Sequence, residues 1–235
     1  MSKRQNSPRK ADEIRSSWWR SSLVKLYEIL TRNDAVQPAD LIFVMAGQMQ
    51  RKQYGLELFR AGVSPKLVLS IGRFEVSKMC NLDFEGTEEL MTLRGRTPPD
   101  ERHFFATVDG SGISTEKARI PIWNTYGEAL ALRHLLEREK ARRVIVVSSD
   151  MHLRRVALTV GKVFRSETVE FLYCPIPSRL MSRRQENWWV RADDRRSVLL
   201  EMIKLAGYGV ILSLPPRVAF RIMQLNDGNH SAYWC

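Results

Sequence analysis

Four short runs of almost uninterrupted apolar residues constrain the fold of this chain more than any other feature. Strands that are apolar on both faces are typical of a parallel sheet covered by helices on each side. The spacing and content of these runs therefore predict four buried strands. The runs are ADLIFVMAG at 39–47, PKLVLSIG at 65–72, RRVIVVSS at 142–149 and VEFLYCPIP at 169–177.

The segments around these runs have apolar residues at helical spacing. Because strands and helices then alternate along the chain, we expect an α/β fold with a mostly parallel sheet of four to five strands. The strands at 39–47 and 142–149 should be central. The expected helices span 14–30, 51–62, 124–140, 152–164 and 195–209.

The rest of the chain suggests one domain with extensions. Residues 1–12 are polar and basic and predict a disordered tail, residues 13–214 form the α/β domain, and residues 215–235 are a C-terminal extension. The block at 73–120 is an insertion or lid, which we expect over the carboxyl edge of the sheet. Within it, HFFATV at 103–108 is a possible fifth strand, and the sequence after it predicts a loop.

The charge of the chain points to anionic partners. Its 37 Lys and Arg residues outnumber 26 Asp and Glu residues, for a net charge of +11. Such a balance suits phosphorylated metabolites, a membrane surface or nucleic acid, and does not choose among them. No known nucleic-acid-binding motif accompanies it.

Several targeting and metal-binding patterns are missing from the sequence. The N-terminus lacks the apolar core of a secretory signal, and the uncharged run at 205–216 is too short to span a bilayer. We therefore expect no transmembrane segment and a cytoplasmic location, with peripheral membrane contact left open. The three cysteines are far apart, so neither a zinc site nor another metal site is predicted.

Candidate ligand-binding residues follow the predicted strands. In an open parallel sheet, ligands bind beyond the carboxyl ends of the strands. The free N–H groups at the helix starts that follow these ends favour anions. The candidates at these ends are Gly47, Gln48 and Arg51 after the first strand, Ser70 and Gly72 at the second, and Ser149, Asp150, His152 and Arg155 after the strand at 142–149.

The loop after the first strand, AGQMQR, does not match a phosphate-binding P-loop. Gly47 either permits a tight turn or lets a ligand approach the backbone. Arg51 lies in the first turn of a helix, where a cation opposes the helix dipole. It therefore either serves an anion or is solvated.

The segment NTYGE at 124–128 begins the next helix. Thr125 and Glu128 have the spacing of a capping box, which explains both residues structurally. Asn124 is a candidate to point its amide into the crevice.

The segment SSDMHLRR has two readings. Asp150 either caps a helix or pairs with Arg154. His152 lies near a helix N-terminus, which favours its neutral form, so it is either an acid–base group or a structural hydrogen-bonding residue. Arg155 shares a helix face with it.

Taken in order, VMAGQ, RKQYGLELFRAG, LVLSIG, NTYGEA and VVSSDMHLRRV resemble the motifs of the bacterial YdcF, SanA and ElyC domain family. The resemblance covers about residues 39–175. It implies a Rossmann-like three-layer sandwich, and it admits S-adenosylmethionine as a ligand and a role with envelope or peptidoglycan precursors.

The resemblance carries the family's site onto nine positions, which are Gly47, Arg51, Ser70, Gly72, Asn124, Thr125, Ser149, His152 and Arg155. The chain departs from the pattern where Ala46 and Gln48 replace glycines and Ile71 replaces the middle of S-G-G. Gly127 stands at the family's glutamate and Glu128 at its asparagine, so either the acid is displaced by one place or the chemistry at this position differs. This looks like a divergent, YdcF-like branch.

Three functions compete. The first is an enzyme, a hydrolase or transferase, acting on a phosphorylated or nucleotide-like small molecule. Arg51 and Arg155 would clamp its anionic oxygens, and His152 would act as acid or base, with Glu128 as a second catalytic candidate. The second is a non-catalytic nucleotide or S-adenosylmethionine binding protein, and the third is a nucleic-acid binder. The sequence does not identify a cofactor.

Overall fold

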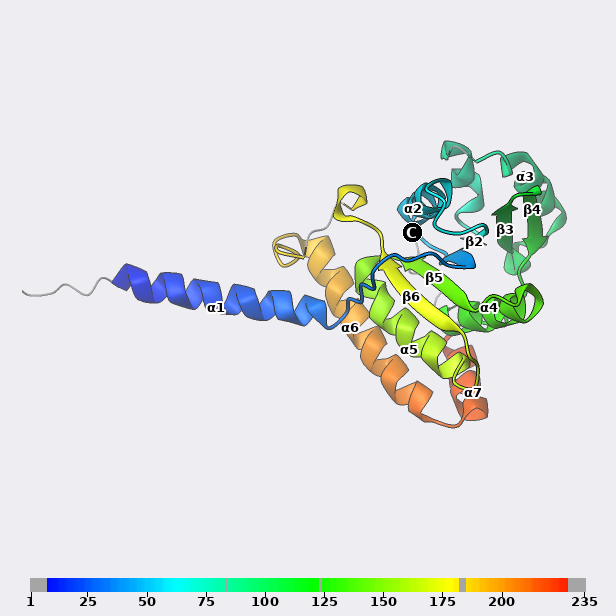
Figure 1. Ribbon diagram of the computed structural model, residues 1–235. Coiled ribbons are helices and arrows are strands. Elements are labelled where there is room, and N and C mark those ends of the chain that lie inside the picture. The colour runs from blue at the N-terminus through cyan, green and yellow to red at the C-terminus, as the bar shows by residue number, and fades with distance from the viewer. Residues whose placement is uncertain (1–7, 83, 123, 182–184, 228–235) are drawn as a thin grey trace, which may run out of the picture.

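The computed structural model describes residues 8–82, 84–122, 124–181 and 185–227. Its centre is a six-stranded sheet of order β4-β3-β2-β1-β5-β6 (Figure 1). The neighbours among β2, β1, β5 and β6 pair in parallel, and β3 and β4 continue the β2 edge antiparallel. The strands are β1 (Leu41–Val44), β2 (Leu67–Gly72), β3 (His103–Asp109), β4 (Gly112–Lys117), β5 (Arg143–Ser148) and β6 (Glu170–Pro175).

Helices cover both faces of this sheet, because alternate residues of its apolar strands point to opposite sides. Leu41 and Phe43 of β1 face a core shared with α4, α5, α6 and α7. Ile42 and Val44 face a second core shared with α2 and α3. The helices are α1 (Pro8–Glu28), α2 (Met49–Arg60), α3 (Thr87–Arg96), α4 (Thr125–Glu139), α5 (Leu153–Val163), α6 (Ala192–Ser213) and α7 (Pro216–Asp227).

The expected α/β class and the central position of β1 and β5 are confirmed. The expected number of strands was too low, because residues 112–117 form β4 instead of a loop. Gly112 has a φ of 120° at the hairpin turn, and exposed and partly buried residues alternate over the first four positions of β4. That period of two was the overlooked signal of a strand.

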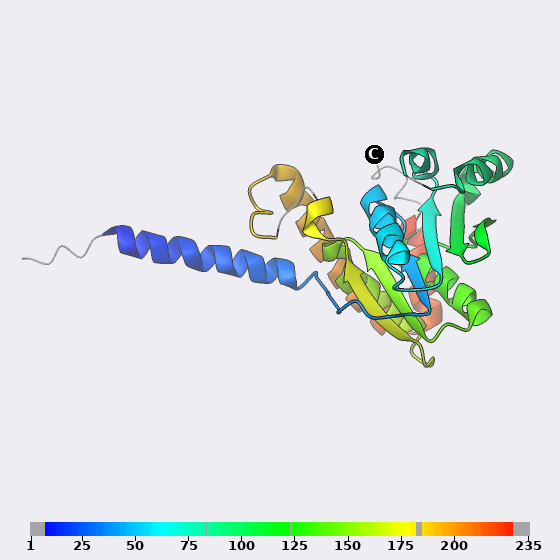
Figure 2. The same cartoon turned by 45° about the horizontal axis from the view of Figure 1, so that its top comes forward.

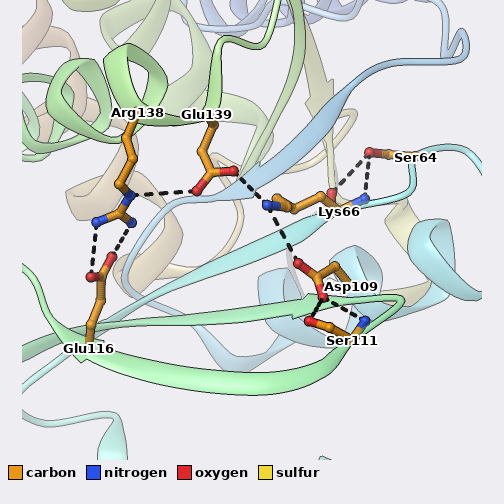
Figure 3. Close-up of polar contacts among 7 residues, drawn as sticks. All are labelled: Ser64, Lys66, Asp109, Ser111, Glu116, Arg138 and Glu139. Carbon is orange, nitrogen blue, oxygen red and sulfur yellow. Dashed lines mark hydrogen bonds and ion pairs between the residues drawn. The ribbon is translucent and has the colours of Figure 1, made fainter.

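The block at 73–120, which we expected to be an insertion or lid, contributes two strands to the sheet. It contains two short 3₁₀ helices, η1 (Val76–Asn81) and η2 (Pro99–Glu101), and α3, and it ends in the hairpin that extends the sheet beside β2. Charged pairs fasten this hairpin to the end of α4 (Figure 3). Lys66 Nζ lies 2.5 Å from Glu139 and 3.5 Å from Asp109, and Arg138 lies 2.5 Å from Glu116.

Both ends of the described chain are more helical than expected. Helix α1 begins at Pro8, before the expected Ile14, so residues 8–12 are helical and 1–7 lie outside the described residues. Helix α6 continues through Gly207 and Gly209 to Ser213. In the C-terminal extension, α7 buries Ala219 and Met223, and residues 228–235 lie outside the description.

Gly127 should be essential for the packing of the first turn of α4. A Cβ atom there would lie 1.9 Å from the backbone oxygen of Ile122, which cannot move freely. We expect Gly127→Ala to lower the free energy of unfolding by about 2 kcal/mol or more. Gly161→Ala is the matched control in α5, where a Cβ atom would meet nothing within 4 Å.

The control should be neutral or stabilising by up to about 1 kcal/mol, because alanine favours a helix over glycine. Urea unfolding of both variants measures the difference. Equal stability of the two variants would contradict the close packing of Gly127.

Candidate functional site

The turn from β1 into α2 is shaped around Arg51. Gly47 has a φ of 129°, a conformation that favours glycine. A Cβ atom at this position would lie 2.7 Å from Arg51 Nη1, so the guanidinium lies directly against the glycine. Arg51 and Lys52, both in the first turn of α2, are buried.

Arg51 is a buried cation whose direct partners are neutral. Its Nε and Nη2 donate to Ser149 Oγ at 3.1 and 2.9 Å, and Nη1 donates to the backbone oxygen of Ala46. No carboxylate of the described residues pairs with it. Burial lowers its pKa, with attraction by Glu75 and Glu128 acting in the opposite direction, and a guanidinium still stays protonated. Of its five N–H donors, those three are engaged.

The neighbouring Lys52 is neutralised, in contrast. It is fully buried, pairs with Glu75 and donates to the backbone oxygen of Met45 at 3.3 Å. Glu75, which follows β2, also accepts the backbone N–H of Gly47. Burial lowers the pKa of Lys52, and Glu75 partly offsets that effect. Glu75 therefore holds the β1–α2 turn and the lysine together.

Glu128 braces the same turn from α4. Its Oε1 accepts the backbone N–H of Ala46 at 2.7 Å, and its carboxylate is hydrogen bonded to Ser70. Ser70 Oγ in turn lies 2.7 Å from His103 Nε2. Burial raises the pKa of Glu128. It lowers the pKa of His103 to about 3, with Lys52 acting in the same direction.

A second cluster gathers at the start of α5. Glu201 of α6 lies 2.9 Å from His152 Nδ1 through Oε2 and 2.5 Å from Arg155 Nε through Oε1. Arg155 also donates to Thr125 Oγ1, and its guanidinium lies 5.1 Å from the ring centre of Tyr208. Arg155 is thus neutralised by a carboxylate, which Arg51 is not.

The pKa values in this cluster fix the protonation of His152. Burial lowers the pKa of His152 to about 4, although Glu201 opposes that effect. Burial alone would raise the pKa of Glu201, but His152 and Arg155 lower it to about 2. Burial likewise opposes the charge of Arg155, and Glu201 outweighs it and raises the pKa. At neutral pH the site therefore holds a neutral imidazole, a carboxylate and a guanidinium.

The tautomer of His152 follows from these contacts. Nδ1 lies 2.9 Å from Glu201 Oε2, an acceptor, and 3.1 Å from Arg155 Nη2, a donor. We place the proton on Nδ1, because it then donates to the nearer, charged acceptor. The lone pair is left on Nε2, which has no hydrogen-bond partner in the described part of the chain.

The cluster around Arg51 and the cluster around His152 are adjacent. Ser149, three residues before His152, contacts Arg51, and the charge of Arg51 acts on His152. Ser149 accepts from Arg51 and donates to Gln48 Oε1 at 3.3 Å. Arg51 also lowers the pKa of His152 by repulsion. Gln48, Ser70, Thr125 and Ser149 therefore all have side-chain contacts within these two clusters. The fully buried hydroxyl of Ser148, at the end of β5, has no partner among the described residues.

Other predicted residues have different roles. Asn124, not Thr125, caps α4, because its Oδ1 accepts from the backbone N–H groups of Tyr126 and Gly127. The predicted capping box is therefore wrong, and Asn124 uses its oxygen on the helix. Asp150 accepts from Tyr27 at 2.6 Å and does not pair with Arg154.

Gly72 is close to the site through its backbone. It pairs with His103 of β3, and a Cβ atom at Gly72 would lie 3.2 Å from Glu75 Oε1. Within the described ranges no group of three or more His, Cys, Asp or Glu side chains could hold a metal ion.

The most important residue that was missed is Glu201. It is 2% exposed within a helix whose sequence is largely apolar, and it was not among the predicted site residues. A buried acid must be paired. A single glutamate among the apolar residues of this helix was therefore the sequence signal for a buried, paired carboxylate. Lys52 and His103 gave no comparable signal in the sequence.

Comparisons of the chain with protein-family models, curated proteins and solved structures found no match. The resemblance to the YdcF, SanA and ElyC family thus stays a prediction from the motifs.

Stability should fall as the pH drops from about 7 to about 5. The pKa of His152 is about 4 and that of His103 about 3 in the folded protein, below the value of about 6.5 in an unfolded chain. The unfolded chain therefore binds protons that the folded protein rejects, and the loss is about 3 kcal/mol in all. Glu201, with a pKa of about 2, adds a further loss only below about pH 4.

Urea unfolding at the two pH values measures this loss. His152→Asn should remove about half of it, because asparagine does not titrate. His134→Asn is the control, since the His134 side chain is 73% exposed. A pH dependence that is unchanged in His152→Asn would contradict the neutral, buried state of His152.

Proposed function

We propose that this edge of the sheet binds a phosphorylated or nucleotide-like small molecule, with Arg51 holding its anionic oxygens and His152 as the acid–base group. The observation that carries the proposal is the state of Arg51. It is 6% exposed, and a serine hydroxyl and a backbone oxygen are its direct partners. A buried charge without an ion-pair partner costs several kcal/mol, and an anionic ligand would supply the missing partner.

The guanidinium also has the geometry for this ligand. Its planar fork matches phosphate oxygens, and two of its five donors remain for a ligand after its three bonds to Ser149 and Ala46. Arg51 lies in the first turn of α2, where free backbone N–H groups also favour an anion. Binding would thus give Arg51 a direct anionic partner, in addition to the attraction by Glu75 and Glu128.

Arg155 was expected to be a second anion clamp, and its contacts favour another role. Its guanidinium is neutralised by Glu201 and engaged by Thr125. We therefore assign it, with Glu201, to positioning His152. Glu128 is assigned to holding the β1–α2 turn, because its carboxylate is occupied by Ala46 N and Ser70.

The proposed chemistry is phosphoryl or pyrophosphoryl hydrolysis or transfer. Neutral His152 would accept a proton at Nε2 from the attacking water or hydroxyl. Glu201, 2.9 Å from Nδ1, would stabilise the imidazolium that forms. Arg51 would hold the phosphoryl oxygens as charge develops. The sheet covered on both faces and the motif order support a Rossmann-like sandwich of the YdcF-like type as part of this proposal.

Calorimetric titration with inorganic pyrophosphate, ADP and S-adenosylmethionine tests the ligand class, and a phosphate-release assay tests turnover. We expect the phosphorylated probes to bind. Binding without phosphate release would favour a non-catalytic binding protein. Binding of S-adenosylmethionine alone would contradict the proposal.

Replacing Arg51 by methionine should separate binding from stability. The variant should bind pyrophosphate roughly 10- to 100-fold more weakly, because hydrogen bonds to a charged group are lost. Its free energy of unfolding should stay within about 1 kcal/mol of the original or rise, because a buried cation has been replaced by an apolar side chain of similar length.

Arg154→Met is the matched control. Arg154 is the neighbour of Arg155 on α5 and is exposed, and among the described residues its side chain donates only to the backbone oxygen of Ile29. Its replacement should leave pyrophosphate affinity unchanged. A large loss of stability in Arg51→Met with full affinity would show that Arg51 is structural.

A further inference from the structure

We propose that a surface formed by α1, the turn before α6, and α6 itself binds membranes that contain anionic lipids. We call it the tryptophan surface. Its exposed apolar side chains include Trp18 at 76%, Val190 at 64% and Ile203 at 68% exposure. The full set is Trp18, Trp19, Val190, Leu199, Leu200 and Ile203.

The elements that carry this surface are packed together, although they lie far apart in the sequence. The rings of Trp19 and Trp189 meet edge to face at 5.8 Å, and Trp188 Nε1 donates to the backbone oxygen of Leu23 at 3.1 Å. Tyr27 of α1 and Val198 of α6 also belong to one buried hydrophobic cluster. Both views show α1 projecting away from the sheet, beyond the end where it meets this cluster (Figures 1 and 2).

Positive charge concentrates in the same two parts of the chain. Residues 1–30 carry seven Lys and Arg against three Asp and Glu, and residues 179–235 carry nine against five. Several of these cations lie among the aromatic residues. The guanidinium of Arg20 is 5.6 Å from the ring centre of Trp19, and Arg195 donates to the backbone oxygens of Trp189 and Val190 at 2.8 and 3.0 Å.

This combination matches the interface of a bilayer. Tryptophan favours the level of the lipid headgroups, exposed aliphatic side chains enter the acyl boundary, and Arg residues attract anionic headgroups. None of the helices in the described residues is long and apolar enough to cross a membrane. The proposed contact is therefore peripheral.

Two other occupants suit the surface less well. Tryptophan and arginine also bind single-stranded nucleic acid by stacking, but Leu199, Leu200 and Ile203 offer nothing for a base to stack on. A second copy of the chain in a two-fold dimer would bring the same basic groups face to face, which is repulsive. An anionic lipid surface satisfies both the apolar and the charged groups.

Sedimentation of the full chain with vesicles tests the proposal. One set of vesicles contains phosphatidylcholine alone, and the other contains equal parts of phosphatidylcholine and phosphatidylglycerol. We expect binding to the second set only, weakened by added salt. A variant with Trp18→Ser, Leu199→Ser and Ile203→Ser should bind roughly tenfold more weakly or not at all, and it should fold normally because these side chains are exposed.

The matched control removes three exposed apolar side chains elsewhere, in Val36→Ser, Phe74→Ser and Met91→Ser. It should bind vesicles like the original chain, and circular dichroism should show both variants folded. The proposal is overturned if the original chain does not bind the anionic vesicles or if the two variants bind equally. It is also overturned if the tryptophan-surface variant instead loses dimerisation or oligonucleotide binding that the original chain shows.

Discussion

Three buried cations at the carboxyl end of an apolar sheet impose the constraint on which much of this structure depends. A charge removed from water needs a partner, and each cation obtains one differently. Lys52 pairs with Glu75 from the segment after β2. Arg155 pairs with Glu201 of α6. Arg51 has a hydroxyl and a backbone oxygen as its direct partners. The β1–α2 turn, the segment after β2 and α6 each supply partners for these cations. Arg51, the cation without a carboxylate partner among the described residues, is the one that we propose to bind the ligand.

The parts of the fold that sequence could predict are those with a local cause. The apolar runs predicted parallel strands, because a strand buried on both faces must be apolar along its length. These runs lie around Leu41, Leu67, Val144 and Phe171. The rule that ligands bind at strand ends then identified Arg51, Ser149 and His152. Glu201 was not predicted because its role depends on contacts with residues of α5, which only folding brings near. Glu128 was misassigned because Thr125 and Asn124 are adjacent and either can cap a helix, and only the three-dimensional arrangement sends the glutamate toward Ala46. The polar strand β4 lacked the apolar content by which the other strands were found.

The short segment from Ser149 to His152 links the candidate site with the tryptophan surface. On one side, Ser149 accepts from Arg51. On the other, Asp150 accepts from Tyr27 of α1, and Met151 packs in the same cluster as Trp188 and Val198. His152, the proposed acid–base residue, is therefore next in sequence to Met151, which packs in one cluster with Tyr27 of α1. The two proposals rest on different observations and meet at this one segment.

The position of Glu201 in the chain also has a consequence for biosynthesis. A ribosome makes the chain from its N-terminus, so every strand of the sheet, through Pro175, leaves the ribosome before α6 does. During that interval the sheet can pair, while Arg155 and His152 lack the carboxylate that compensates them. Any sheet that forms during that interval therefore has an incomplete charge network. Docking of the last long helix completes that network, so the site matures only when nearly all of the described chain has been made.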